Sequence, residues 1–209
     1  MEILKAELKK KLDKISQIYI FTQEIYLYTE YFYNPNTQNE FMLLTNSIHS
    51  THLRFISHIM FRTLIIEISK LYSHSDSDKY RLESFIISLA KNGHFRKINF
   101  PNDKVEKWKK QLELDTNKNI IDELLQLRSK VYAHTDDLSN LTQKTDVTFE
   151  KIKSLLDLAL DIIKSVFSIV FNTHFDEESS QFDKERFLAL KILAKGEALR
   201  QDEIYNQLI

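Results

Sequence analysis

Two side chains that could do chemistry together, Arg128 and His134, lie six positions apart in the second half of the chain. On a helix, residues three, four and seven positions apart share a face. The neighbours of Arg128 at such spacings are mostly apolar, namely Ile121, Leu124, Leu125, Val131 and Tyr132. An arginine is rarely fully buried without a partner, and it keeps its charge inside proteins. A carboxylate, a subunit interface or a bound anion would each explain an arginine at this position.

His134 adds a group that can take up and release a proton near neutral pH. Six positions on an ideal helix separate two side chains by about 120°, so Arg128 and His134 do not converge within one straight helix. They can converge if His134 lies beyond the helix end, or if a second copy of the chain supplies one of them. Spacing alone favours a simpler interpretation, in which a buried structural arginine is followed by a histidine that stabilises the helix C-terminus.

The composition indicates long helices that position these residues. Among 209 residues there are only 2 Gly and 2 Pro, so few residues are available to form turns. There is no cysteine, which excludes disulfides and cysteine-based zinc sites. The net charge of −1 gives no overall basic field for nucleic acid. No segment reaches the ~18 uncharged apolar residues of a membrane span, so we expect a cytoplasmic protein with no membrane partner.

Apolar residues recur at helical spacing along most of the chain. The expected helices cover about 2–33, 40–72, 79–92, 103–112, 119–133, 148–172 and 183–195. Gly93 and Gly196 are expected to end two of them, because glycine fits the left-handed position after a helix. The predicted fold is all-α, an up-down bundle of four to five core helices. We expect residues 1–175 to form the bundle and residues 176–209 an extra C-terminal helical appendage.

Two further groups of charged residues have a functional and a plainer interpretation. Glu67 lies beside an apolar stripe and could neutralise Arg128, or it could pair with Lys70 one turn away. Lys104, Lys107, Lys109 and Lys110 surround Trp108, and this cluster could contact RNA phosphates and bases. The same cluster could be a solvated helix face with one anchored tryptophan. No residue pattern predicts a metal or cofactor site.

One run of sequence resembles a known family. The run LRSKVYAHTD, from Leu127 to Asp136, is similar to the Arg-x4–6-His signature of the HEPN superfamily. It most resembles the branch that contains the abortive-infection U-type (AbiU-like) proteins. The run FRTLIIEISKLY at positions 61–72, followed by a Ser/Asp loop and Arg81, also looks like that branch. The resemblance covers about residues 41–172.

This resemblance implies a helical bundle, usually dimeric, that is often a metal-independent endoribonuclease. It implies that Arg128 and His134 are the catalytic pair, with RNA as substrate. A histidine can move the proton of the attacking 2′-OH, and a guanidinium can hold the charge that builds on phosphate oxygens. The expected supporting residues are Glu67, Ser129, Tyr132 and Asp136. The expected RNA contacts are Lys130, Lys104, Lys107 and Trp108.

Ser129 stands where active members of the family commonly carry Asn, Asp or His, and it favours an alternative. In that alternative the chain is a non-catalytic HEPN module that binds RNA or a protein partner. A helical oligomerisation scaffold is a third interpretation. If the chain is the endoribonuclease, we expect a homodimer that acts in bacterial defence, in abortive infection or as a toxin. An antitoxin or regulatory protein would then be a further partner.

Overall fold

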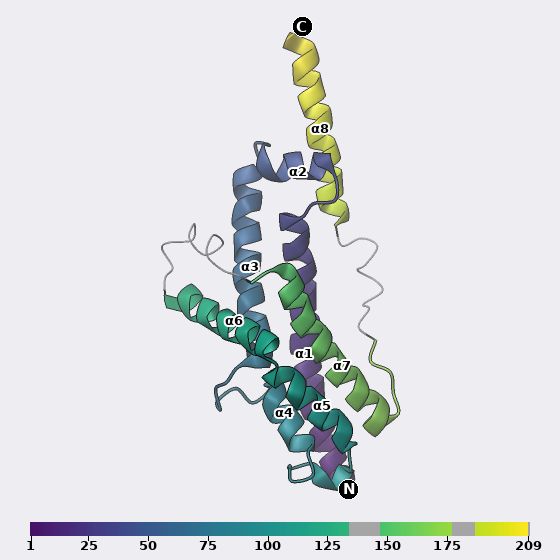
Figure 1. Ribbon diagram of the computed structural model, residues 1–209. Coiled ribbons are helices and arrows are strands. Elements are labelled where there is room, and N and C mark those ends of the chain that lie inside the picture. Colours follow the sequence, from purple (N-terminus) through teal and green to yellow (C-terminus); the bar gives the residue numbers. More distant parts are fainter. Residues whose placement is uncertain (134–146, 177–186, 209) are drawn as a thin grey trace. The chain divides into compact units, whose positions relative to one another are not determined.

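The computed structural model describes residues 1–133, 147–176 and 187–208, and within these segments the chain is all-α with no strand. This confirms the predicted fold class, a HEPN-like helical bundle. Figure 1 shows the helices in their order along the chain. Their bounds are α1 Glu2–Tyr33, α2 Gln38–Thr45, α3 Ser50–Tyr72, α4 Leu82–Leu89, the 3-10 helix η1 Arg96–Ile98, α5 Asn102–Glu113, α6 Asp115–Ala133, α7 Phe149–Phe171 and α8 Leu188–Leu208. None of these helices combines the length and apolar character needed to cross a bilayer.

The chain divides into two compact units. Unit 1 comprises Met1–Glu24 and Arg62–Phe175, and unit 2 comprises Ile25–Phe61 and Asp176–Ile209. Residues 25–61 group with the C-terminal segment in unit 2, because α2 packs against α8.

The core of unit 1 is built on α7, whose apolar residues recur at helical spacing and are buried as predicted. They include Ile152, Leu155, Leu156, Ala159, Ile162, Ile163 and Val166. Burying each of the valine, leucine and isoleucine side chains contributes about 1.5–3 kcal/mol. Tyr72 at the end of α3 donates its hydroxyl hydrogen to the backbone oxygen of Leu155, and burial raises the pKa of Tyr72. On the other side, Lys9 of α1 lies 4.6 Å from the ring centre of Phe167. These contacts fix α3 and α1 against α7.

Unit 2 is organised around α2 and α8. Thr37 caps α2 by accepting from the backbone N–H of Glu40, and the Glu40 carboxylate accepts from the N–H of Thr37 in return. This reciprocal pair satisfies backbone donors at the helix start and also the buried carboxylate. Behind it, Leu43, Leu44, Leu53 and Ala194 form an apolar cluster, with Phe32 and Leu190 packed against it.

The single helix expected over residues 40–72 is wrong, because the chain breaks between α2 and α3. Ser47 donates its hydroxyl to the Leu43 carbonyl oxygen, and its Oγ accepts from the backbone N–H of His49. A serine side chain that bonds nearby backbone groups competes with the helical hydrogen-bond ladder. The polar run of Thr45, Asn46 and Ser47 was the signal for this break.

The role predicted for both glycines is also wrong, because neither has a left-handed backbone. A Cβ at Gly93 would lie 2.3 Å from the Ile87 carbonyl oxygen, so this position requires glycine for close backbone approach. Gly196 lies inside α8 with open space around it. The helix continues past it because no proline follows and because Glu197 and Arg200 pair one turn apart at 2.7 Å.

Candidate active site

Arg128 lies on α6 on the same face as Ile121 and Leu124, which are buried as the apolar stripe predicted. Its side chain is 30% exposed, so the stem is packed and the guanidinium reaches the edge of the core. Asp78, in the loop between α3 and α4, lies opposite, with its Oδ2 3.7 Å from Nη1 of Arg128. The carboxylate partner that the arginine required is therefore supplied by this loop.

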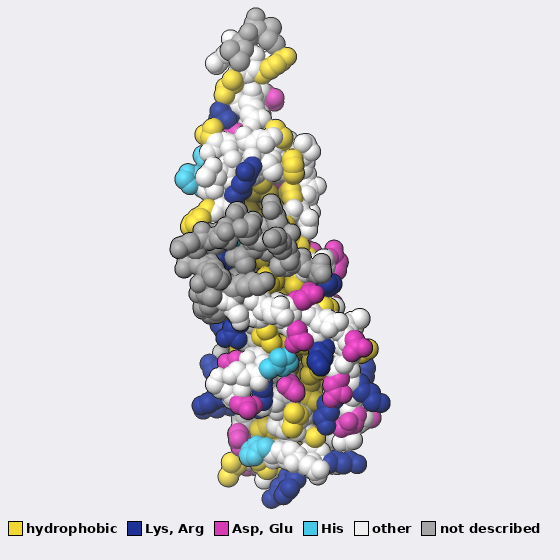
Figure 2. Space-filling view, turned by 60° about the vertical axis from the view of Figure 1, so that its left-hand side comes forward, with side chains coloured by type: hydrophobic (Ala, Val, Ile, Leu, Met, Phe, Trp, Pro, Cys, Tyr) yellow, Lys and Arg dark blue, Asp and Glu magenta, His cyan; other side chains and the backbone are white. Residues whose placement is uncertain are grey.

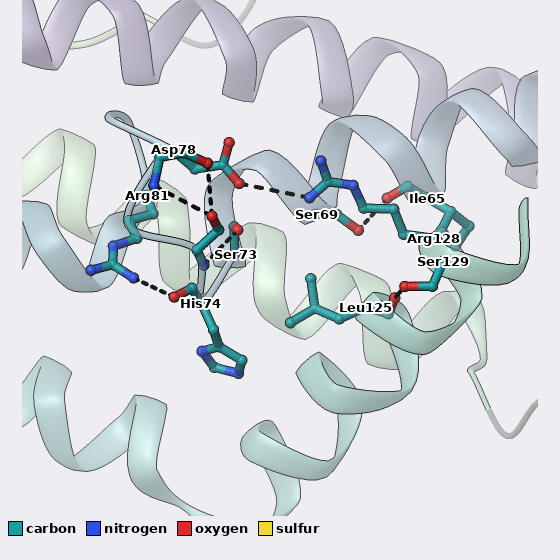
Figure 3. A network of polar contacts seen from close by, with 11 residues as sticks. Ile65, Ser69, Ser73, His74, Asp78, Arg81, Leu125, Arg128 and Ser129 are labelled. Atoms are coloured by element: carbon teal, nitrogen blue, oxygen red, sulfur yellow. Dashed lines mark hydrogen bonds and ion pairs between the residues drawn. The ribbon is translucent and has the colours of Figure 1, made fainter. Parts of the chain in front are cut away.

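The loop that carries Asp78 is held by hydrogen bonds from Arg81 (Figure 3). Arg81 donates from Nη1 to the backbone oxygen of His74 at 2.8 Å and from Nη2 to Asp76 Oδ1 at 2.5 Å. The backbone N–H of Asp78 donates to the Ser75 carbonyl oxygen at 3.1 Å. These bonds give the loop a defined shape beside α6.

An open pocket lies between this loop and α6. It is lined by Ser73, His74, Ser75, Leu125, Arg128 and Ser129. Figure 3 shows Leu125 between the His74 ring and the Arg128 side chain. A guanidinium at the wall of an open pocket has the fork geometry and fixed charge to hold a phosphate.

The Ser129 hydroxyl forms a hydrogen bond within its own helix. Its Oγ donates to the Leu125 carbonyl oxygen at 3.1 Å. The hydroxyl hydrogen is therefore directed to the backbone, which leaves the oxygen with acceptor capacity only. In this arrangement Ser129 does not offer a donor to a bound phosphate.

Glu67, predicted to pair with Arg128 or Lys70, pairs with Lys70. Its Oε1 lies 2.5 Å from Lys70 Nζ, one helical turn further along α3. The Glu67 side chain is 12% exposed and the lysine is more open, so this is a helix-surface ion pair at the edge of the core. The structure therefore favours the plainer of the two interpretations of Glu67.

The cluster of lysines around Trp108 is built differently from an RNA-stacking surface. Trp108 is only 1% exposed, and its indole N–H donates to Asp161 Oδ2 at 2.8 Å. Lys104 donates to Ser165 Oγ at 3.2 Å, while Lys107 is exposed. Trp108 therefore anchors α5 to α7, and its ring is not open to a base. Over the lower half of Figure 2, Lys and Arg side chains lie among Asp and Glu, a face of mixed charge.

Four predicted site residues lie wholly or partly outside the described part of the chain. His134 and Asp136 fall in the segment 134–146, which the structure does not describe. Lys130 and Tyr132 lie on α6, but their side chains are not described either. The structure thus brings Arg128 and Ser129 together at one pocket. The roles of His134, Asp136, Lys130 and Tyr132 at this site stay predictions.

His74 and Asp122 are two site residues that the sequence did not predict. His74 lines the pocket of Arg128, and its Nε2 lies 3.3 Å from Asp122 Oδ1 on α6. A histidine between serines, just after a helix, was the available signal, but only the folded chain shows that it meets α6. Within the segments that the structure describes, no three His, Asp or Glu side chains gather as they would around a metal ion.

The described segments form an all-helical module with an arginine at an open pocket. The HEPN family model described as AbiU2 matches residues 5–185, most of the chain. The protein therefore belongs to this abortive-infection-related family, which confirms the resemblance of the run around Arg128. Comparisons with curated proteins and with solved structures gave no match.

Proposed function

We propose that this protein is an endoribonuclease of HEPN type that cleaves RNA without a metal ion and acts in bacterial defence, in abortive infection or as a toxin. The observation that carries the proposal is the Arg128 guanidinium at the wall of an open pocket, in a chain of the AbiU2 family. The packed stem of Arg128 holds the guanidinium in place, and a positioned charge stabilises a transition state better than a mobile one.

In the proposed reaction the 2′-oxygen of a ribose attacks the adjacent phosphorus. His134 takes the proton from that 2′-OH as a general base, and Arg128 holds the negative charge that builds on the non-bridging phosphate oxygens. The bond from phosphorus to the 5′-oxygen then breaks, and this oxygen gains a proton. The products are a 2′,3′-cyclic phosphate and a 5′-OH end, and no step requires a metal ion.

The proposal includes a homodimer, because Arg128 and His134 would diverge on one straight helix and because the HEPN resemblance implies a dimer. A second copy would complete a composite cleft. The protein would act in the cytoplasm, where its RNA substrates lie, under control of an antitoxin or regulatory protein. Sedimentation across micromolar concentrations tests the dimer, and a monomer at every concentration would contradict the composite cleft.

A second candidate function is a non-catalytic HEPN module that binds RNA or a protein. The observation that favours it is the hydrogen bond from Ser129 to the Leu125 carbonyl, which withdraws one donor from the pocket. Such a module would bind RNA through Arg128 without cleaving it.

Incubation of the purified wild-type protein with total RNA in EDTA separates the two candidates. The proposed enzyme produces fragments that carry a 2′,3′-cyclic phosphate and a 5′-OH, and end-specific ligation identifies both ends. RNA that is bound but stays intact under all conditions would contradict the enzyme and support the binding module.

A further inference from the structure

A second histidine lies at the pocket of Arg128. His74, in the loop after α3, lines this pocket together with Arg128 and Ser129. It also lines an adjoining pocket with Tyr72, Glu83, Leu112, Glu113, Lys118 and Ile121. The His74 side chain is 58% exposed, so a ligand that spans the two pockets would meet its ring.

Two contacts hold His74 in place, one at its ring and one at its backbone. Asp122 lies with its Oδ1 3.3 Å from His74 Nε2, and an ionised carboxylate only accepts hydrogen bonds. Nε2 therefore carries a hydrogen, and Nδ1 is the nitrogen available to a substrate. Arg81 fixes the backbone by donating to the His74 carbonyl oxygen at 2.8 Å. This arrangement, a carboxylate that holds an imidazole, resembles the base and its orienting carboxylate in a hydrolase triad.

The proposed reaction has a chemical requirement that His134 alone does not meet. The attacking 2′-oxygen and the leaving 5′-oxygen lie roughly in line on opposite sides of the phosphorus. One imidazole that removes the proton from the first oxygen is therefore poorly placed to protonate the second. A second proton-transfer group, from another direction, would protonate the leaving oxygen.

We propose that His74 is this second group, the general acid that protonates the leaving 5′-oxygen, with Asp122 as its positioning residue. The inference rests on the proposed ribonuclease function. In the step, the imidazolium of His74 gives its Nδ1 proton to the 5′-oxygen as the bond from phosphorus to that oxygen breaks. His134 has by then gained the 2′-OH proton, so one proton is taken up and one is released. Exchange with water restores both histidines, and Asp122 balances the imidazolium charge of His74.

The chain offers a matched control for His74 in His94. His94 forms the same kind of pair within unit 1, with its Nε2 3.0 Å from Glu7 Oε1. The two histidines are almost equally exposed, at 58% and 57%. His94 does not line the pocket of Arg128. A generic effect of removing a surface histidine that pairs with a carboxylate would therefore occur in both variants.

The test compares two oligonucleotides that each contain a single ribonucleotide. One has the natural 5′-oxygen as leaving group, and the other has sulfur in its place, which leaves as a thiolate without needing a proton. We expect His74→Ala to slow cleavage of the oxygen substrate by about 10²–10⁴-fold and to cleave the sulfur substrate at close to the wild-type rate. His94→Ala should match wild type on both. Asp122→Asn should show a smaller loss on the oxygen substrate that sulfur also restores.

Equal losses on both substrates would overturn the acid role, since a merely structural effect does not depend on the leaving atom. An unchanged rate for His74→Ala on the oxygen substrate would also overturn it and would assign the proton to another donor. If the wild-type protein cleaves neither oligonucleotide nor total RNA, the proposed function itself fails. That outcome is distinct from a wild-type enzyme that does not need His74.

Discussion

Arg128 on α6 faces Asp78 of the loop between α3 and α4, with 3.7 Å between Nη1 and Oδ2. This separation is longer than a hydrogen bond, so the attraction is that of two partly exposed charges. Such a pair contributes little to stability and is weakened by salt. A phosphate that enters the pocket would compete with Asp78 for the same guanidinium.

Asp78→Asn should therefore tighten RNA binding several-fold, because it removes the carboxylate that competes with the phosphate. The free energy of unfolding should change by less than about 1 kcal/mol, as for other exposed ion pairs. Binding of a 2′-O-methyl RNA, which lacks the attacking hydroxyl and cannot be cleaved, checks this when it is measured at several salt concentrations. Asp76→Asn, which changes a highly exposed carboxylate in the same loop, is the control. Weaker binding by Asp78→Asn alone would mean that Asp78 positions the guanidinium instead of competing with RNA.

Glu67→Gln should have a small effect on stability. Glu67 pairs with Lys70 on the same helix, and such a pair typically contributes about 0.2–0.5 kcal/mol. We expect the free energy of unfolding, measured in urea, to fall by less than about 1 kcal/mol. A loss of about 3–5 kcal/mol, as on breaking a buried pair, would show that Glu67 also neutralises a buried charge such as Arg128.

Trp108→Phe should lower stability without changing RNA binding. The substitution removes the indole N–H that donates to the exposed Asp161 carboxylate, and it shortens a side chain that is almost fully buried. We expect a loss of about 1–3 kcal/mol in the free energy of unfolding. Lys107→Ala, on the exposed side of the same helix, should change stability by less than about 0.5 kcal/mol. If Trp108→Phe bound RNA more weakly at a temperature where the variant is fully folded, Trp108 would be shown to contact RNA after all.

Glu197 should make unit 2 sensitive to acid. The pKa of Glu197 is lowered to about 2, mainly by the hydrogen bond from Arg200 and with smaller contributions from Gln201 and His49, against the opposing effect of burial. Because the folded pKa lies below the ordinary value near 4.5, this stabilisation is present above pH 4.5 and is lost as the pH falls toward 2. Helix content followed by circular dichroism should therefore fall in this range, and Glu197→Gln should flatten the change. An identical acid transition in both proteins would contradict this assignment.

The sequence predicted those parts of the fold that depend on local pattern. The spacing of apolar residues in α7 identified its buried face, and the neighbours of Arg128 indicated a packed stem. Both follow from the helical period, which acts within one element. The break before α3 was missed, although Ser47 marks it, because the apolar pattern on both sides of it is continuous.

The partners across the site could not be predicted, because they depend on tertiary packing. Asp78 and His74 are both about fifty positions from the α6 residues that they meet. Their own neighbourhood, rich in Ser and Asp, indicates only a loop. For Glu67 the sequence allowed two partners, Arg128 and Lys70. In the folded chain it pairs with Lys70, the one that lies close in sequence.

Cleavage of RNA in EDTA by wild type, His134→Ala and His94→Ala is the decisive test of the proposed ribonuclease. We predict that wild type and His94→Ala produce 2′,3′-cyclic phosphate ends at equal rates. His134→Ala should be slower by about 10²–10⁴-fold, the usual contribution of a general base, with an unchanged helical spectrum. Equal cleavage by His134→Ala and wild type, or wild-type activity that EDTA abolishes, would contradict the account.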